Sequence, residues 1–279
     1  MPYTLYIVGT PIGNLEDVTL RCLRILSEVS LIAAEDTRVT RKLLSRYGIH
    51  TPLTSFNNHN WKSKLPKLLE VLKEANVALV TDAGTPNISD PGYELTTGAV
   101  QDGAQLSVIP GPSALTAAVS LSTLRLDRFV FMSFLPRRTS QRRRILMDLA
   151  EEQHPIVVFE SPHRLQACLK DILGTLGDRL VTVCRELTKL HEEVYRGTIG
   201  EALDHFSQPR GEFTLIIQGA TNTRQVPNVD NVRQALLNFS TQGFSAKDSI
   251  SQVSSLTSLS RRDLYKLWLT LPKSKGRRR

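Results

Sequence analysis

The sequence predicts an α/β fold of two domains, followed by a small helical appendage. Short β-rich runs alternate with helical patterns over the first part of the chain, and the next part has fewer helices between its strands. Strand signals then end at Gly219. A chain of 279 residues with 41% hydrophobic content is long enough to bury two ordinary cores.

The first domain, residues 1–125, is expected to be layered around a largely parallel sheet, because strands and helices alternate in it. Its strands are predicted from short apolar runs bounded by turn residues, and its helices from apolar residues at helical spacing. The expected strands are 4–8, 31–34, 77–81 and 105–109, and the expected helices are 18–29, 39–46, 61–75 and 113–121.

The second domain, residues 126–220, has fewer helices, so we expect a mixed or antiparallel sheet. Ser161 and Pro162 have the form of an N-cap followed by proline at the first helical position, which predicts a helix to about residue 176. The expected strands are 129–134, 155–159, 180–185, 193–198 and 212–218.

The appendage, residues 228–279, follows a polar linker at 221–227 and lacks strand signals. Ser245 and Ser260 stand where N-caps belong, and the link between the last two expected helices is tight. The expected helices are 229–239, 246–256 and 261–269. Two capped short helices joined in this way resemble a helix-turn-helix, although any small helical appendage would give a similar pattern.

Positive charge is concentrated in two places. Of the net charge of +8, about seven units come from residues 261–279, which contain eight Lys or Arg against Asp263 alone. A second cluster consists of Arg137, Arg138, Arg142, Arg143 and Arg144. Clustered cations attract a polyanion such as nucleic acid, while the alternative is a solvated face and a frayed terminus.

The sequence offers no sign of a membrane segment, a secretion signal or a metal site. No apolar run approaches the ~18 residues that a bilayer requires, and residues 1–9 lack the pattern of a signal peptide. Cys22, Cys168 and Cys184 stand far apart, which argues against a disulfide framework or a paired metal ligand set. We therefore expect a cytoplasmic protein without a metal or a membrane partner.

Four loops rich in turn residues follow expected strands, at 9–14, 81–92, 110–114 and 159–164. Loops beyond the carboxyl ends of strands form the ligand crevice of open α/β sheets. The first loop matches neither the GxGxxG nor the P-loop pattern, so a phosphate-binding glycine signature is not expected. Each loop alone would more often be a tight turn, but four together favour a binding site.

Six ordered motifs resemble those of the tetrapyrrole methylase superfamily of S-adenosylmethionine-dependent enzymes. Within it, the sequence resembles the branch that methylates ribose 2′-hydroxyls of bacterial small-subunit ribosomal RNA. The motifs are VGTPIGNLED at 8–17, AEDTR at 34–38, TDAGTPNISDPG at 81–92, PGPSA at 110–114, FLPR at 134–137 and FESPHR at 159–164. The resemblance covers residues 4–219 and, for the helical appendage, about 229–271, with Thr81 as a small departure from the usual Ser.

This resemblance implies a tetrapyrrole-methylase-like fold, a homodimer, and S-adenosylmethionine held between the two domains. It also implies that the acceptor is a cytidine ribose in the decoding region, in naked small-subunit ribosomal RNA or in the assembled small subunit. By matching positions, the implied cofactor contacts are Asp82, Gly84, Thr85, Ile88, Ser113, Ala114, Phe159, Glu160, Leu187 and Phe213.

Methyl transfer to a ribose hydroxyl benefits from a general base. The candidates are Glu35, Asp36, Asp90, His163 and Lys189. We favour Lys189, because basic neighbours would lower its pKa, or Asp36, although Asp36 could instead cap the helix that follows it. Arginine does not deprotonate, so Arg38, Arg137, Arg138, Arg164 and Arg185 are predicted to contact RNA phosphates.

Two other functions stay open at this point. One is C-methylation of a small tetrapyrrole intermediate, which would need neither the helical appendage nor so basic a tail. The other is a non-catalytic RNA-binding module, against which the cofactor loops and the acid–base residues argue.

Overall fold

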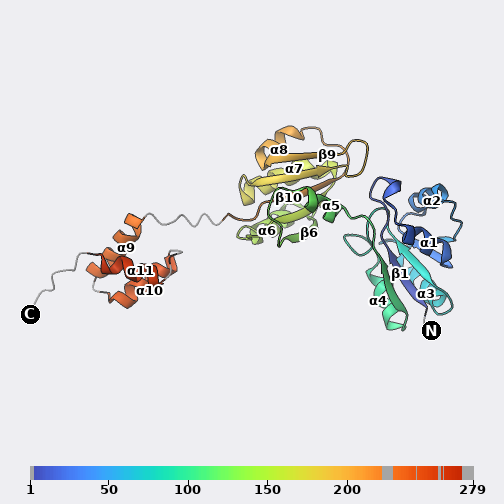
Figure 1. Cartoon of the computed structure of the whole chain (residues 1–279), viewed down its shortest axis with the longest axis horizontal. Coiled ribbons are helices and arrows are strands. Elements are labelled where there is room, and N and C mark those ends of the chain that lie inside the picture. The colour runs from blue at the N-terminus through green and yellow to red at the C-terminus, as the bar shows by residue number, and fades with distance from the viewer. Residues whose placement is uncertain (1–2, 222–228, 243, 257–258, 260, 272–279) are drawn as a thin grey trace, which may run out of the picture. The chain divides into compact units, whose positions relative to one another are not determined.

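The structure is a computed structural model that describes residues 3–221, 229–242, 244–256, 259 and 261–271. It divides into two compact units, Met1–Ala220 and Thr221–Arg279, each of which is described by itself (Figure 1).

The first half of the first unit alternates strands and helices, as expected. Its elements are β1 (Thr4–Val8), the short 3-10 helix η1 (Leu15–Asp17), α1 (Leu20–Glu28), β2 (Leu31–Ala34), α2 (Thr37–Arg46), β3 (Leu53–Ser55), α3 (Trp61–Leu72), β4 (Val77–Val80), α4 (Tyr93–Gln101), β5 (Gln105–Ile109) and α5 (Ala114–Leu121). The sequence analysis did not predict β3 or α4.

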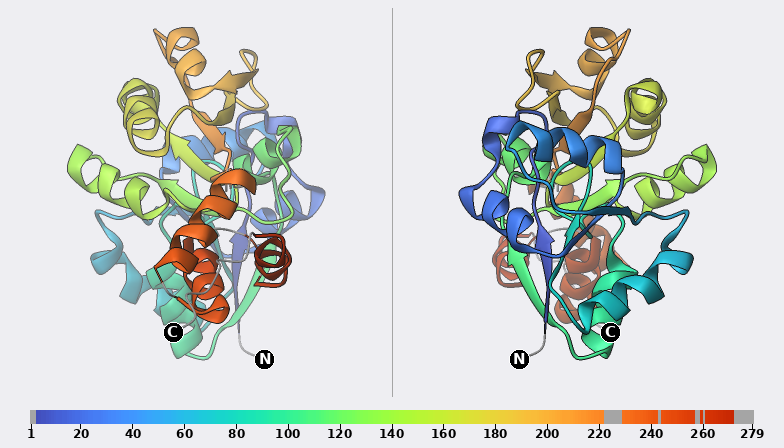
Figure 2. Two further views of the ribbon diagram at one scale, coloured as in Figure 1. Left: turned by 90° about the vertical axis from the view of Figure 1, so that its left-hand side faces the viewer. Right: turned by 90° about the vertical axis from the view of Figure 1, so that its right-hand side faces the viewer.

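These five strands form one fully parallel sheet in the order β3-β2-β4-β1-β5. Alternate strand residues contribute to two separate cores, one shared with α1 and α2 and the other with α3 and α4. Figure 2 shows the blue helices α1 and α2 apart from the teal helices α3 and α4. Burial on both faces explains why β4 is apolar and buried along its whole length.

The second half of this unit contains a mixed sheet, again as expected. Its elements are β6 (Val130–Phe134), α6 (Thr139–Asp148), β7 (Ile156–Glu160), α7 (Pro162–Leu176), β8 (Leu180–Arg185), β9 (Glu193–Thr198), α8 (Ile199–His205) and β10 (Phe213–Ile217). The strand order is β6-β7-β10-β8-β9; β6 and β7 are parallel, whereas the other pairs are antiparallel.

The two faces of this second sheet have different partners. One face packs on α6, α7 and α8 around a core that includes Leu165, Leu169 and Leu215. The other face, with Val157 and Ile216, packs on residues of the first half, including Ala118 of α5. Figure 1 shows α5 beside β10, so a helix of the first half covers the second sheet.

The second unit contains three helices in its described residues, α9 (Val229–Thr241), α10 (Ala246–Leu256) and α11 (Arg261–Leu269). They surround a small core of their own that includes Leu236, Val253 and Leu264. Ser245 caps α10, as expected, since its hydroxyl accepts from the Asp248 amide at 3.2 Å. Residues 222–227 of the expected linker, the expected cap Ser260 and the basic end at 272–279 lie outside the described residues.

The division into domains 1–125, 126–220 and 228–279 stays a prediction. Its first boundary falls in the segment between α5 and β6, where the chain passes from one sheet to the other. Within the described residues, no helix is long and apolar enough to cross a bilayer.

Candidate functional site

Loops from both sheets surround a cavity of about 400 Å³. On the first sheet these loops follow β1, β4 and β5, three strands that are neighbours, so their carboxyl ends meet. This volume lies in the range of small-molecule sites. The lining residues are Ile12, Ala83, Gly84, Thr85, Ile88, Ser89, Asp90, Ser113, Ala114, Phe134, Phe159, Glu160, Ser161, Pro162, Cys184, Leu187, Glu212, Phe213 and Thr214.

Backbone contacts fix the three loops of the first sheet against one another. The amide of Thr10 donates to Gly84 O at 2.8 Å, and the amide of Gly84 donates back to Thr10 O at 3.1 Å. A Cβ on Gly111 would lie 2.6 Å from Gly9 O. The loops after β1 and β5 therefore approach so closely that only glycine fits between them.

The loop after β4 has an unusual backbone. Asn87 and Ser89 have φ angles of 72° and 70°, and Gly92 has a φ of 147°. Conformations of this kind are uncommon for residues with a side chain and cluster at functional sites. The side-chain amide of Asn87 donates to Thr96 Oγ1 at 3.1 Å, which ties this loop to the first turns of α4.

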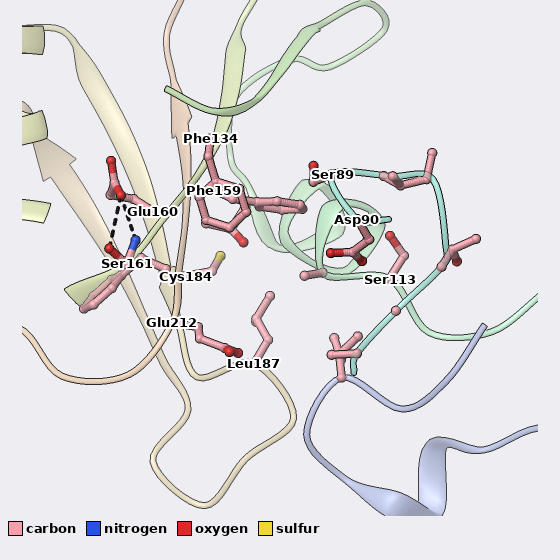
Figure 3. A pocket seen from close by; sticks show the side chains of 18 of the residues that line it. Ser89, Asp90, Ser113, Phe134, Phe159, Glu160, Ser161, Cys184, Leu187 and Glu212 are labelled. Carbon is pink, nitrogen blue, oxygen red and sulfur yellow. Dashed lines mark hydrogen bonds between the residues drawn. The ribbon is translucent and has the colours of Figure 1, made fainter. Parts of the chain in front are cut away.

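The second sheet supplies the opposite wall. Phe159 and Glu160 end β7, and Phe213 begins β10, which is antiparallel to β7 and pairs with it through Phe213 and Glu160. The end of one strand and the start of the other therefore face the same cavity. Phe134 lies edge-to-face with Phe159 at a centroid distance of 5.7 Å, and both line the cavity (Figure 3).

Nine of the ten residues expected to contact a cofactor line this cavity; Asp82 does not. The Asp82 carboxylate instead accepts from the Asp36 amide at 3.0 Å, while its own amide donates to Glu35 Oε2 at 3.3 Å. Asp82 thus connects the ends of β2 and β4. That the other nine bind a cofactor is a proposal that their position supports.

Asp36 caps α2, which is the structural alternative that the sequence analysis left open. Its carboxylate accepts from the Arg38 amide at 2.8 Å and pairs with the Arg38 guanidinium at 2.6 Å. These hydrogen bonds lower the pKa of Asp36 to about 2. Neither residue lines the cavity, so Asp36 as a base and Arg38 as a phosphate contact stay proposals without support from the geometry.

Lys189 lies among acids, not among cations. Its ammonium is 2.8 Å from Glu186 Oε1 and 2.9 Å from Glu212 Oε2. Burial acts to lower the pKa of Lys189, but these two hydrogen-bonded carboxylates raise it above its ordinary value. The expectation of a lowered pKa is therefore wrong, because the groups that contact the Lys189 ammonium are the carboxylates of Glu186 and Glu212 and not its basic neighbours in sequence.

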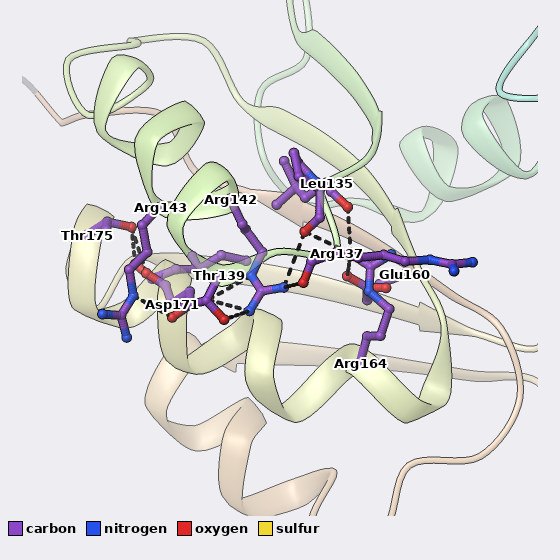
Figure 4. A network of polar contacts seen from close by, with 11 residues as sticks. Leu135, Arg137, Thr139, Arg142, Arg143, Glu160, Arg164, Asp171 and Thr175 are labelled. Atoms are coloured by element: carbon purple, nitrogen blue, oxygen red, sulfur yellow. Dashed lines mark hydrogen bonds and ion pairs between the residues drawn. The ribbon is translucent and has the colours of Figure 1, made fainter.

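The arginine cluster of the second domain is divided between the interior and the surface. Arg142 is buried, and its Nε donates to Asp171 Oδ2 at 2.7 Å, while Arg143 Nε donates to Asp171 Oδ1 at 2.7 Å (Figure 4). Arg137, Arg138 and Arg144 are exposed. The cluster therefore presents fewer free cations than its sequence suggests.

Arg164 and Arg185 make internal contacts. Arg164 Nη2 donates to Leu135 O at 2.5 Å and lies 3.4 Å from Glu160 (Figure 4). Arg185 donates to Arg210 O at 2.7 Å and pairs with Glu193 at 3.0 Å. Of the five arginines predicted to contact phosphate, Arg137 and Arg138 are the two that are exposed and have no ion pair among the described residues.

Several cavity residues were not predicted, among them Ile12, Ser89, Phe134, Cys184, Glu212 and Thr214. Cys184 and Thr214 lie opposite each other on β8 and β10, so only the strand register could reveal them. Phe134 and Ser89 do stand inside recognised motifs. Among the described residues, no group of three or more His, Cys, Asp or Glu is placed to hold a metal ion.

Comparison with known proteins identifies clear relatives. The family model of Tetrapyrrole (Corrin/Porphyrin) Methylases matches residues 4–203. A protein of Thermotoga maritima named Ribosomal RNA small subunit methyltransferase I is 51% identical over 218 residues, which cover 77% of this chain and 98% of that protein. A protein of the same name from Synechocystis sp. is 45% identical over 272 residues, which cover 96% of this chain and 98% of the relative.

Solved structures share the fold at lower identity. A cobalt precorrin-4 methyltransferase of cobalamin biosynthesis gives a TM-score of 0.59 at 19% identity, covering 76% of this chain and 94% of its own. A uroporphyrin-III-C-methyltransferase from Thermus thermophilus gives 0.54 at 19% identity, covering 76% and 93%. At this identity the likeness shows the fold alone.

Proposed function

Because this chain belongs to the tetrapyrrole methylase family, we propose that it is a methyltransferase that uses S-adenosylmethionine to methylate small-subunit ribosomal RNA. The observation that supports this most is the cavity between the two sheets. It brings together nine of the ten expected cofactor residues, seven from three of the six motifs, one that follows β8 and one that begins β10. The relatives named above, similar over most of the chain, supply the class of acceptor.

The chemistry of the cavity wall fits this cofactor. S-adenosylmethionine supplies a methyl group on a positively charged sulfur and carries no phosphate. The lining residues include three carboxylates, on Asp90, Glu160 and Glu212, and neither Lys nor Arg, so the wall suits a cation. The Ser89 hydroxyl is buried without a hydrogen-bond partner in the described structure, and it would hold a polar group of the cofactor.

The same wall offers apolar surface for the adenine. Ile12, Leu187 and Phe213 line the cavity, each nearly inaccessible to solvent. A planar base between such side chains would remove further apolar area from water. We propose that these residues hold the base, while Gly84 and Ser113 approach the rest of the cofactor with backbone and hydroxyl groups.

The acceptor in this proposal is the 2′-hydroxyl of a cytidine ribose in the decoding region. This choice of nucleotide and hydroxyl follows from the motif resemblance. An experiment must therefore detect a 2′-O-methyl group on a cytidine of the decoding region. An RNA acceptor is supported by the surface near the cavity, since exposed Arg137 and Arg138 follow Phe134, which lines the cavity, by only three and four residues. A tetrapyrrole acceptor would make no use of these arginines or of the basic helical unit.

We also propose that the protein forms a homodimer through the free edge of the first sheet. β5 ends this sheet, and its Leu106 and Val108 are 42% and 56% exposed. An exposed apolar edge strand is a liability unless something covers it. The partner we infer is a second copy, because the homodimer that the motif resemblance implies would cover this edge with the same surface of its partner.

Mass mapping of ribose methylation in small-subunit RNA tests the function. RNA from cells that lack this protein should miss one 2′-O-methyl group, and the purified protein should restore it in the presence of S-adenosylmethionine. Offering naked RNA and assembled subunits separately identifies the substrate form, and a ribosomal substrate would place the protein in the cytoplasm. Unchanged ribose methylation throughout the small-subunit RNA contradicts the proposal.

A further inference from the structure

Asp90 is a carboxylate of the cavity wall that the sequence analysis named among five candidate bases but did not favour. It is half-buried in the loop after β4, and its carboxyl group points into the cavity, on the side opposite Glu160 and Ser161 (Figure 3). Of the three carboxylates that line the cavity, Glu212 pairs with Lys189, and Glu160 lies against Arg164. Asp90 has no ion pair among the described residues.

The backbone on both sides of Asp90 adopts unusual conformations. Ser89, immediately before it, has a positive φ of 70°, and Gly92, two residues after it, has a φ of 147°. A Cβ on Gly92 would collide with the side-chain oxygen of Asn87. A loop that keeps a non-glycine residue in this region of φ maintains strain, and such strain is typical of segments that aim a functional side chain.

Two further carboxylates act on Asp90 from neighbouring elements. Glu35 follows β2, and Asp82 follows β4. Burial, together with the negative charges of Glu35 and then Asp82, raises the pKa of Asp90 to about 7, against the opposing effect of the Thr81 hydroxyl. Asp90 therefore exchanges a proton in the neutral range, where a general base works best.

We propose that Asp90 is the general base that takes the proton from the acceptor hydroxyl. This inference rests on the proposed function and adds to it the residue that moves the proton. As the acceptor oxygen forms its bond to the methyl carbon, its O–H bond breaks and the proton passes to a carboxylate oxygen of Asp90. The electron pair of the carbon–sulfur bond that breaks stays on the sulfur of the donor, which loses its positive charge.

Lys189 and Asp36, the two bases favoured from the sequence, are less well placed than Asp90 to take this proton. Lys189 is outside the cavity lining and is held in its ammonium form by Glu186 and Glu212. Asp36 is also outside the lining and is occupied as the cap of α2. A base must reach the hydroxyl within hydrogen-bond distance, directly or through one water, so a group in the cavity wall is favoured.

The assignment predicts a definite pH dependence. Asp90 accepts a proton only when ionised, so kcat/KM for S-adenosylmethionine should rise with pH and level off above about 7, the pKa of Asp90 before the cofactor binds. A bound cofactor brings positive charge close to the carboxylate and favours its ionised form. The acid limb of kcat should therefore lie at a lower pH than that of kcat/KM.

The first experiment compares Asp90→Asn with wild type and with the control Asp102→Asn, a change at an exposed aspartate that follows α4. Asp90→Asn should lower the single-turnover methylation rate by about 100-fold or more, the usual contribution of a general base, and should abolish the acid limb. Its affinities for S-adenosylhomocysteine and RNA should stay at the wild-type level. Asp90→Glu should recover part of the rate, and Asp102→Asn should behave as wild type.

The second experiment does not depend on activity. Carbon-13 NMR of labelled aspartate carboxyls, with the Asp90 signal assigned by its absence in Asp90→Asn, should show a midpoint near 7 in the free protein. Glu35→Gln should move this midpoint to lower pH, because it removes a like charge while keeping an oxygen that can accept from the Asp82 amide.

Three results overturn the assignment alone: a wild-type rate in Asp90→Asn, a loss of cofactor affinity as large as the loss of rate, or an Asp90 titration near the ordinary aspartate range. The second of these would make Asp90 a cofactor contact. A wild-type protein that methylates no small-subunit RNA would overturn the proposed function, and the assignment with it. The NMR titration distinguishes the cases, since it requires neither RNA nor donor.

Discussion

Two glycines show how single residues shape the site. Gly9 directly follows β1, and Gly111 stands in the loop after β5. Each backbone occupies the space that a Cβ on the other would need. Gly111 has no positive φ, so its requirement is steric and does not come from an unusual conformation. The sequence alone could not show that these two glycines, which are 102 positions apart, lie against each other.

Gly111→Ala should therefore destabilise the protein and weaken cofactor binding together. A methyl group 2.6 Å from Gly9 O must push the two loops apart, at a cost of about 1–3 kcal/mol in the free energy of unfolding. Urea denaturation and cofactor titration measure both effects.

The matched control is Gly174→Ala in α7, where a Cβ would meet no heavy atom within 4 Å. Alanine is the better helix former, so this variant should be as stable as wild type or more stable, by up to about 1 kcal/mol. If both variants behave alike, the loops have enough freedom to accommodate the methyl group, and the steric argument for Gly111 is wrong.

At the scale of elements, α6 has both a structural and a surface role. Arg142 faces inward and joins Asp171 of α7, whereas Arg144, two residues further on, is exposed. Burial opposes ionisation of Asp171, yet hydrogen bonds from Arg143 and Arg142 hold its pKa below the ordinary value. Helical periodicity therefore divides one run of arginines between the interior and the exposed surface, where we propose that RNA binds.

Arg142→Ala should destabilise the first unit by about 3–5 kcal/mol, the usual effect of breaking a buried ion pair from one side. Arg144→Ala should change stability by less than about 0.5 kcal/mol while lowering RNA affinity. Chemical denaturation and RNA titration of both variants provide the comparison. Equal destabilisation by the two changes would mean that the buried pair contributes nothing.

The same pair predicts a dependence of stability on acid. Because the pKa of Asp171 is lowered in the folded protein, its stabilisation is complete above the pKa of the unfolded carboxyl and is lost as pH falls through the lower folded value. Thermal unfolding measured from neutral to acid pH should show a smaller loss in Arg142→Ala than in wild type. A parallel pH dependence in both proteins would contradict the role of this ion pair.

β5 is the element on which the dimer proposal depends. Val108→Asp would place a carboxylate on the exposed edge and should convert the dimer to a monomer, because the interface would have to bury an unpaired charge. Val100→Asp on α4 is a close control, since Val100 and Val108 are 55% and 56% exposed. Sedimentation velocity measures the oligomeric state of each protein. The proposal is contradicted if the wild type is a monomer or if Val108→Asp remains a dimer.

The elements missed by the sequence analysis have weak local signals. β3 has only three residues, and α4 contains Gly98 and two adjacent threonines, which are poor helix formers. Gly98 is explained by packing, because a Cβ there would lie 3.2 Å from Leu69 of α3. α8 has seven residues, but its capping box of Thr198 and Glu201 was a signal that the sequence did contain.

For the molecule as a whole, motifs located the site better than they assigned its chemistry. Loops after β1, β4 and β5 were expected at one edge because parallel strands end together, and the structure places them there. Electrostatic roles were harder to predict, since Lys189 was expected among cations but pairs with Glu186, three residues before it, and with Glu212, just before β10. The contact with Glu186 is local, whereas the contact with Glu212 depends on long-range packing, which local sequence does not encode.

The chain divides into two compact units at residue 220, and the last prediction follows from this division. Residues 1–220 contain four hydrophobic clusters of their own, and the described residues beyond them contain a fifth. All residues that line the cavity belong to the first unit. A protein ending at residue 220 should therefore fold and bind S-adenosylmethionine with wild-type affinity.

RNA affinity of the shortened protein should fall, and its dependence on salt should become shallower. Residues 261–279 contain eight Lys or Arg against one acid, and each phosphate neutralised adds to the slope of log affinity against log salt concentration. Exposed Arg137 and Arg138 remain, so a weaker interaction should persist.

A full-length protein with Arg261→Gln and Arg262→Gln, both changes at exposed positions of α11, should have an intermediate slope of log affinity against log salt concentration. Identical salt slopes for the full and shortened proteins would show that the second unit contacts no phosphate, whereas loss of cofactor binding would show that the first unit depends on it.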